Sequence, residues 1–146
     1  MTDHDAGKRP APSLLIADDD PVVYTVLASQ LGPSFDIVGY AHDTDEAIAL
    51  AVKHRPDVAI IDIDMPGGGG VRAAREIHVQ APATAVVALS ADESDKIVRD
   101  VVRAGAVTYV RKGMTAAALT STLQRSIAAH VAQISELDVE VGSLPA

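Results

Sequence analysis

Acidic residues follow two of the apolar stretches in this chain. They are Asp18, Asp19 and Asp20 after SLLIA, and Asp62 and Asp64 at the end of DVAIIDID. Carboxylates that gather at one place repel one another, so a site built from them needs a cation. The chain has no cysteine and its five histidines are scattered, which leaves a hard, oxygen-ligated ion such as Mg²⁺ as the natural partner.

A hydroxyl and an ammonium group end two further apolar stretches. Ser90 closes TAVVALS, and Lys112 follows VTYVR. A nucleophilic carboxylate, Mg²⁺, a hydroxyl and an amine together equip a site for phosphoryl transfer to an aspartate. Of the two candidate acceptors we favour Asp62, because it ends its apolar stretch whereas Asp64 already lies in the loop.

The elements that must position these groups are short apolar runs alternating with amphipathic segments. We predict strands at 13–17, 35–41, 57–62, 84–90 and 107–111, and helices at 21–31, 43–54, 71–80, 94–104 and 115–134. Right-handed crossovers then give an open, doubly wound α/β fold with a five-stranded parallel sheet. The carboxyl ends of its strands share one edge, where such folds bind ligands.

Several helix boundaries are marked in the sequence. Asp20 precedes Pro21 and is predicted to cap the first helix. Asp43 is predicted to cap the second, Gly105 to end the fourth, and Thr115 to cap the fifth. Four glycines (67–70) predict a flexible loop before the third helix; they lack the G-K-[ST] of a P-loop, so we expect no nucleotide site there.

Composition sets the limits of the domain. We divide the chain into a flexible leader (1–12), one domain (13–134) and a tail or linker (135–146). The net charge of −8 argues against direct nucleic-acid binding. Neither a signal peptide nor an apolar run long enough to span a membrane is found, so we expect a cytoplasmic protein.

Five separated motifs give the chain a specific resemblance. They are LIADDD, IIDIDMP, ALSA, the AGA before the last strand, and YVRKG. In this order the chain resembles the receiver domain of a bacterial two-component response regulator over about residues 13–130. The resemblance implies a flavodoxin-like fold with strand order 2-1-3-4-5 and five helices, and Mg²⁺ as cofactor.

The resemblance also assigns roles to the acidic residues. Asp62 stands at the phosphoacceptor position and is also implied as a metal ligand. Asp19 is implied as a direct Mg²⁺ ligand and Asp18 as a ligand through water, and the backbone carbonyl of Asp64 would supply a further ligand. Asp64 and Asp92 are also departures from the commonest pattern, and we expect both to tune the rate at which phosphate is lost.

Three more positions match functional positions of the family. Ser90 would be the switch hydroxyl, Lys112 the lysine that contacts the phosphoryl group, and Tyr109 the aromatic residue whose rotamer follows the switch. Ala91 is small and would leave the phosphoryl group accessible. Because Gly113 and not proline follows Lys112, a trans peptide bond is expected between them.

The implied partner is a sensor histidine kinase or a phosphotransfer protein. The chain would catalyse only its own phosphorylation and dephosphorylation, so it is not otherwise expected to be an enzyme. Phosphorylation would change the face formed by the segments 94–104, 107–111 and 115–134. Val101, Val102 and Ala117 are expected to be exposed there, as a surface for a partner or a homodimer.

The sequence also permits other interpretations. The chain could be a degenerate receiver that serves as a phosphorylation-independent binding module. Asp62-x-Asp64 also suggests a haloacid-dehalogenase-type phosphatase, but that family places its acid pair after the first strand. Apolar residues from Leu119 to Leu137 could extend the last helix into a coiled coil, although core packing followed by a frayed end is favoured.

Overall fold

The strands and helices alternate along the chain. The computed structural model describes residues 10–91 and 95–143. The elements are β1 (Ser13–Ala17), α1 (Pro21–Leu31), β2 (Asp36–Ala41), α2 (Thr44–His54), β3 (Val58–Asp62), α3 (Gly69–Gln80), β4 (Ala85–Ser90), α4 (Asp95–Ala104), β5 (Thr108–Arg111) and α5 (Ala116–Ser143).

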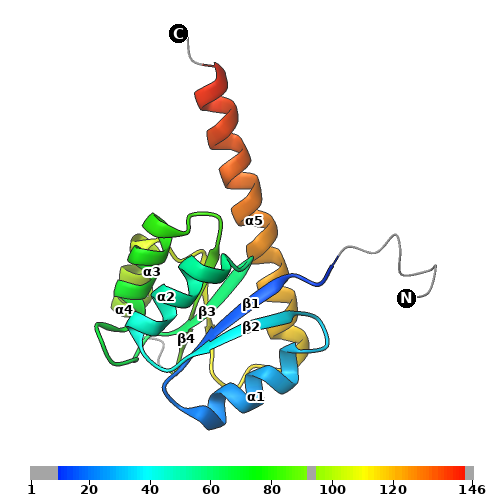
Figure 1. Ribbon diagram of the computed structural model, residues 1–146, viewed down its shortest axis with the longest axis vertical. Helices are drawn as coiled ribbons and strands as arrows, with labels where there is room; N and C mark the ends of the chain where they lie inside the picture. Colours follow the sequence, from blue (N-terminus) through cyan, green and yellow to red (C-terminus); the bar gives the residue numbers. More distant parts are fainter. Residues whose placement is uncertain (1–9, 92–94, 144–146) are drawn as a thin grey trace, which may run out of the picture.

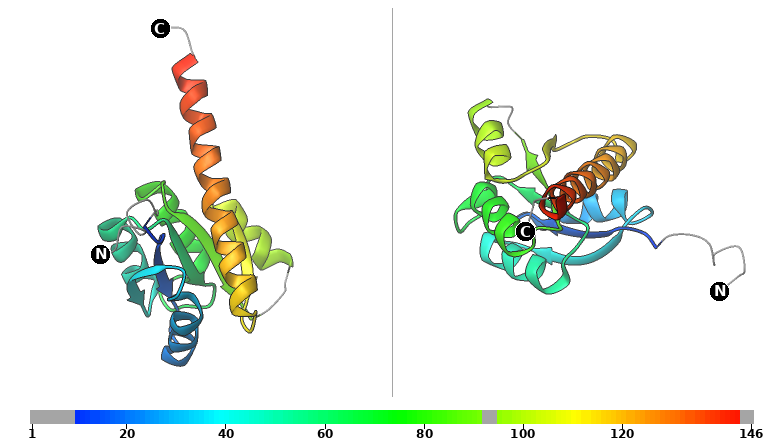
Figure 2. Two further views of the ribbon diagram at one scale, coloured as in Figure 1. Left: turned by 90° about the vertical axis from the view of Figure 1, so that its right-hand side faces the viewer. Right: turned by 90° about the horizontal axis from the view of Figure 1, so that it is seen from above.

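The five strands form one parallel sheet in the order β2-β1-β3-β4-β5 (Figure 1). Helices α1 and α5 cover one face, and α2, α3 and α4 cover the other (Figures 1 and 2). The predicted fold and strand order are therefore confirmed. The order reverses next to β1, so the carboxyl ends of β1 and β3 border the crevice where ligands of such folds bind.

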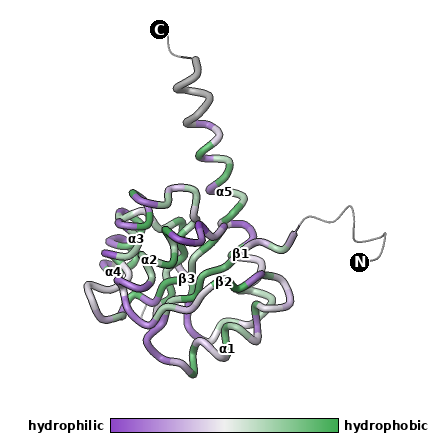
Figure 3. The backbone as a smooth tube through the Cα atoms, in the orientation of Figure 1, coloured by the Kyte–Doolittle hydropathy of each residue, from purple (hydrophilic) through white to green (hydrophobic). Residues whose placement is uncertain are grey.

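The central strands are apolar because both of their faces are covered. All residues of β3 and β4 are buried. Alternate side chains of β1 go to opposite layers: Leu14 and Ile16 pack with α1 and α5, and Leu15 with α2 to α4. Figure 3 shows hydrophobic residues along the central strands and a mixture of hydrophilic and hydrophobic residues along the helices around them. This rigid apolar sheet holds the ends of its strands in fixed positions.

The caps follow the prediction. The side chain of Asp20 accepts a hydrogen bond from the Val22 amide at the start of α1, and Asp43 accepts one from Glu46 at the start of α2. Thr115 accepts from the Ala118 amide before α5. Gly105 follows α4 with a φ of +126°. The described residues contain no cis peptide bond, as expected for the bond after Lys112.

Three expectations about individual elements are wrong. Helix α5 does not end near residue 134 but continues to Ser143 and projects beyond the sheet (Figure 1). Helix α3 begins at Gly69 instead of residue 71, so two of the four glycines are helical. Val101 is buried because it lies on the inward stripe of α4 with Ala104, whereas Val102 and Ala117 are exposed as expected.

No helix in the described ranges is both long enough and apolar enough to cross a membrane.

Candidate functional site

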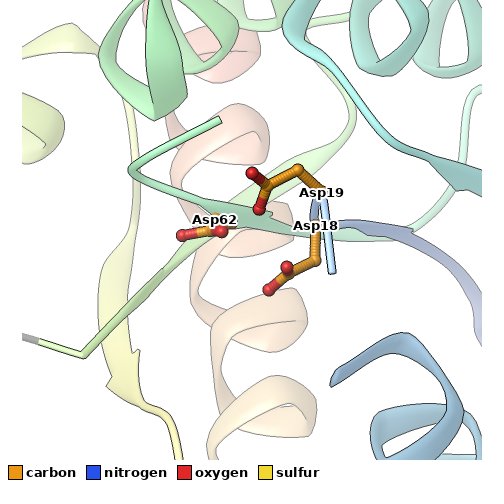
Figure 4. A group of neighbouring side chains, drawn as sticks. All are labelled: Asp18, Asp19 and Asp62. Carbon is orange, nitrogen blue, oxygen red and sulfur yellow. The ribbon is translucent and has the colours of Figure 1, made fainter. Parts of the chain in front are cut away.

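Three aspartates and a lysine meet at the carboxyl edge of the sheet. Asp18 and Asp19 directly follow β1, Asp62 is the last residue of β3, and Lys112 directly follows β5. One carboxylate oxygen from each of the three aspartates lies within 4.8 Å of the others (Figure 4). Asp18 and Asp62 are buried, whereas Asp19 is exposed. The sequence prediction that these strand ends converge is confirmed.

Lys112 contacts both buried carboxylates. Its Nζ lies 3.3 Å from Oδ2 of Asp62 and 3.4 Å from Oδ2 of Asp18. The other oxygens are held by backbone amides: Asp20 donates to Oδ1 of Asp18 at 2.8 Å, and Asp64 donates to Oδ1 of Asp62 at 3.1 Å. These bonds fix the two carboxylates, and the ammonium group lies between them.

The electrostatic balance of this group is uneven, because two buried carboxylates share one ammonium. Burial raises the pKa of Asp62, and the charge of Asp18 raises it further; the Asp64 amide and Lys112 lower it without cancelling the increase. Burial lowers the pKa of Lys112, but the combined attraction of Asp62 and Asp18 outweighs it, so this pKa is raised. Lys112 is therefore held in its charged form.

The three aspartates can bind a metal ion. Oδ2 of Asp18 is buried and accepts no hydrogen bond, although Lys112 is close to it. Because Lys112 is shared with Asp62, it compensates this buried oxygen only in part, and a further cation would lower the cost of burying it. The donors are all carboxylate oxygens, which is the chemistry that hard divalent cations prefer.

The remaining predicted residues belong to β4, to β5 or to the segment after β4. Ser90 is buried at the end of β4, and the Lys112 amide donates to its carbonyl at 3.0 Å. Tyr109 is 37% exposed and pairs in register with Ala88 of β4. Ala91 is exposed, and Asp92 lies outside the described residues.

Tyr40 supports the site and was not predicted. Its hydroxyl donates to the backbone carbonyl of Asp18 at 2.8 Å, and its ring stacks on Tyr24 with centroids 4.1 Å apart. Burial, followed by the charges of Asp18 and the aspartates after it, raises its pKa, so it stays a donor. The signal in the sequence was a tyrosine near the carboxyl end of a predicted strand.

The glycines after Pro66 are required by the path of the chain. Gly67, Gly68 and Gly69 all have positive φ. Gly70 packs so closely that a Cβ there would lie 2.8 Å from Cα of Ile63. Its amide also donates to the Ile63 carbonyl at 2.8 Å. The run thus lets α3 start directly against the end of β3, which explains the early start of this helix; the flexibility of the loop stays a prediction.

A doubly wound sheet with an acid pair, a buried aspartate and a lysine at its carboxyl edge defines the class of phosphoacceptor signalling domains. The chain belongs to the response regulator receiver domain family, whose model matches residues 14–124. The acidic pocket and Lys112 are consistent with a phosphoacceptor switch. The family match also decides against the haloacid-dehalogenase alternative. Membership of this family implies a histidine kinase as partner.

Named relatives agree with this assignment. The transcriptional regulatory protein PdtaR of Mycobacterium tuberculosis is 34% identical over 134 residues, which are 90% of this chain and 63% of PdtaR. The DNA-binding transcriptional activator DevR/DosR of the same species is 36% identical over 101 residues, 68% of this chain and 46% of the activator. The chain thus spans less than two thirds of these relatives.

The chain also matches solved structures of receiver domains over nearly their whole length. The receiver domain of the putative response regulator NarL from M. tuberculosis has a TM-score of 0.78 and 26% identity, over 82% of this chain and 98% of that one. The receiver domain of sensor histidine kinase PA1611 from Pseudomonas aeruginosa, with a magnesium ion coordinated in its active site cleft, has a TM-score of 0.73 and 26% identity, over 82% and 99%.

Proposed function

We propose that Asp62 accepts a phosphoryl group from a phosphohistidine of a sensor kinase or phosphotransfer protein. The observation that carries this proposal is a buried carboxylate at a strand end, 3.3 Å from an ammonium group and inside a group of three aspartates. An oxygen of Asp62 attacks phosphorus, the P–N bond breaks, and the imidazole nitrogen keeps the bonding electrons and takes up a proton. The product is an aspartyl phosphate and a neutral histidine.

Magnesium is the proposed cofactor, with Asp19 and Asp62 as direct ligands, Asp18 as a ligand through water, and the backbone carbonyl of Asp64 as a further ligand. Two observations support magnesium. Oδ2 of Asp18 is buried and accepts no hydrogen bond, and the PA1611 receiver has a magnesium ion coordinated in its active site cleft. When bound, the ion would neutralise charge on the phosphoryl oxygens.

Lys112 has two roles in this proposal. Before transfer its ammonium group favours the ionised form of Asp62, which is the nucleophile. After transfer it is the cation within reach of the new phosphoryl oxygens, since its Nζ already lies 3.3 Å from Asp62. A fixed positive charge that meets developing negative charge is an efficient form of stabilisation.

The output is a shift between two arrangements of the face formed by α4, β5 and α5. The buried hydroxyl of Ser90 would move toward the phosphoryl group, and Tyr109, now partly exposed, would turn inward into the space released. Val102 and Ala117 lie exposed on α4 and α5 of this face. We propose it as the surface for a downstream partner or a homodimer.

Asp64 and Asp92 are the proposed tuning residues, because their carboxylates would change metal affinity and the attack of water on the aspartyl phosphate. We expect Asp64→Asn and Asp92→Asn to change the half-life of the phosphorylated chain. Two half-lives equal to that of the parent would contradict this role. Ala91, which is exposed beside Ser90, would leave the phosphoryl group accessible.

The test of the proposed function uses the full chain, Mg²⁺ and acetyl phosphate, followed by mass spectrometry. We expect the mass of one phosphoryl group to be added to the parent and to Asp64→Asn, which keeps the acceptor. The addition should disappear in Asp62→Asn and when EDTA replaces Mg²⁺. A parent that is never modified would favour a phosphorylation-independent binding module.

A further inference from the structure

The N-terminus of α2 is attached to the loop that joins β3 to α3. Thr44, the first residue of α2, is completely buried. Its amide donates to the Pro66 carbonyl at 3.0 Å and its hydroxyl donates to the same oxygen at 2.8 Å. The hydroxyl oxygen also lies 3.4 Å from the Gly69 carbonyl. One side chain thus contacts both ends of the segment 66–69.

These bonds are not needed to form α2. The cap of that helix is Asp43, whose carboxylate accepts from the Glu46 amide at 2.8 Å. The hydroxyl of Thr44 is therefore free of any capping role, and both its contacts are with the loop. A Cβ on Gly67 would lie 3.3 Å from Cβ of Thr44, so the loop packs tightly on this side chain.

A second contact, made by Arg72 of α3, joins the loop to Asp45 of α2. Nη1 of Arg72 donates to the Gly67 carbonyl at 2.8 Å and to Oδ1 of Asp45 at 2.7 Å. Both charged groups are exposed, so this pair contributes little by itself. The buried Thr44 is the stronger anchor because its donor is shielded from water.

We propose that Thr44 is a positioning residue for the metal site. The segment from Asp62 to Pro66 is held at one end by the bond from the Asp64 amide to the Asp62 carboxylate, and at the other end by Thr44. The carbonyl of Asp64, a proposed ligand, lies in the chain between the anchored Asp64 amide and the anchored Pro66 carbonyl. The inference rests on the proposed function, because it concerns the affinity of the same site for Mg²⁺.

Thr44→Val removes the hydroxyl and keeps the shape, and Thr44→Ser keeps the hydroxyl. Thr84→Val is the matched control: Thr84 is also buried and donates to a proline carbonyl, that of Pro56, at 2.7 Å. Thr84 precedes β4 and so lies at the opposite edge of the sheet from the site. Both valine variants lose one buried hydroxyl donor, but only Thr44→Val loses it next to the metal site.

The measurements are the Kd of Mg²⁺ by isothermal titration calorimetry, urea unfolding, and amide hydrogen exchange of the metal-free chain. We expect Thr44→Val to weaken Mg²⁺ binding by roughly tenfold, the usual effect of losing a group that orients a metal ligand. Exchange at the Gly70 amide should become faster. Thr44→Ser should restore both, and Thr84→Val should unfold more easily but bind Mg²⁺ like the parent.

Two results would overturn the inference while leaving the proposed function intact: a parent-like Kd in Thr44→Val, or an equal loss of affinity in Thr84→Val, with the parent still modified by acetyl phosphate. A parent chain that binds no Mg²⁺ would overturn both proposals.

Discussion

Replacing Asp62, the proposed phosphoacceptor, by asparagine should stabilise the folded chain in the absence of metal. In the parent two buried carboxylates, Asp18 and Asp62, face the single ammonium group of Lys112. Asp62→Asn keeps the size of the side chain and an oxygen that accepts from the Asp64 amide. It leaves Asp18 and Lys112 as a balanced pair. We expect this variant to unfold at a higher urea concentration than the parent at pH 7 in EDTA.

The distances give the size of the effect. With an effective dielectric constant of about 20, attraction across the 3.3 Å between Lys112 and Asp62 is about 5 kcal/mol. Repulsion between Asp62 and Asp18, whose ligand oxygens lie within 4.8 Å, is about 3.5 kcal/mol or more. The net attraction is therefore at most about 1.5 kcal/mol, which is smaller than the several kcal/mol that desolvating a buried carboxylate costs. The variant should thus gain about 1–3 kcal/mol in unfolding free energy.

The pH dependence gives an independent check of the sign. Since burial raises the pKa of Asp62, the folded chain binds this proton more tightly than the unfolded chain. The stability that Asp62 contributes is fully present below its unfolded pKa, about 3.9, and is lost as the pH rises through its folded pKa. The increase in unfolding free energy of Asp62→Asn over the parent should therefore be largest at neutral pH and vanish below about pH 3.9.

Magnesium should reverse the order of stability. At a concentration 100 times its Kd, a ligand that binds only the folded chain adds about 2.7 kcal/mol. The parent should gain this amount, and Asp62→Asn, which has lost a charged ligand, should gain much less. If Asp62→Asn were less stable than the parent in EDTA at pH 7, or if its advantage persisted at pH 3.5, the electrostatic account of the site would be refuted.

Four further variants test other parts of the structure. Lys112→Met should bind Mg²⁺ several-fold more tightly by calorimetry, because a competing cation is gone, yet react more slowly with acetyl phosphate; weaker binding would contradict the charge balance. Gly70→Ala should lower the unfolding free energy by about 1–3 kcal/mol in urea, because its Cβ would lie 2.8 Å from backbone; the usual gain of about 0.4–1 kcal/mol would show that the contact relaxes. His130→Phe removes the donor to the Pro82 carbonyl at 2.7 Å and should cost about 1–3 kcal/mol in the same assay, unless water replaces it. A chain ending at Ile134 should keep the urea midpoint of the parent, since none of the described side chains after His130 is buried; a lower midpoint would extend the domain beyond residue 134.

The strands and the main site were predictable because both depend on local patterns. Buried parallel strands appear as continuous apolar runs, and the last residue of each run is placed at the carboxyl edge by the topology alone. Asp18, Asp62 and Lys112 therefore converge without any knowledge of side-chain contacts. Their distances and the position of the ammonium group between two carboxylates required the structure.

Contacts that depend on how two elements dock were not predictable. Thr44 reaches the Pro66 carbonyl across 22 positions of sequence, and Tyr40 reaches the Asp18 carbonyl across the same separation. Nothing in the pattern around either residue distinguishes a donor to a distant carbonyl from an ordinary helix or strand residue. The end of α5 was missed for another reason: helical periodicity fades once a helix leaves the core, although its backbone hydrogen bonds continue.

The uneven charge of the site links the properties proposed for it. An ammonium group shared by two buried carboxylates cannot satisfy both fully, so Asp18 keeps a buried oxygen without a hydrogen bond. Burial, together with the charge of Asp18, keeps the pKa of Asp62 raised although Lys112 lowers it. The same deficit of positive charge favours the binding of a divalent cation. It also means that the ionised form of Asp62 lowers the free energy of unfolding. Because Lys112 takes part in both contacts, the effects of changing it and of changing Asp62 will not add. The stability of this edge therefore belongs to the group as a whole, and a phosphoryl group that changes its charge changes every contact within it.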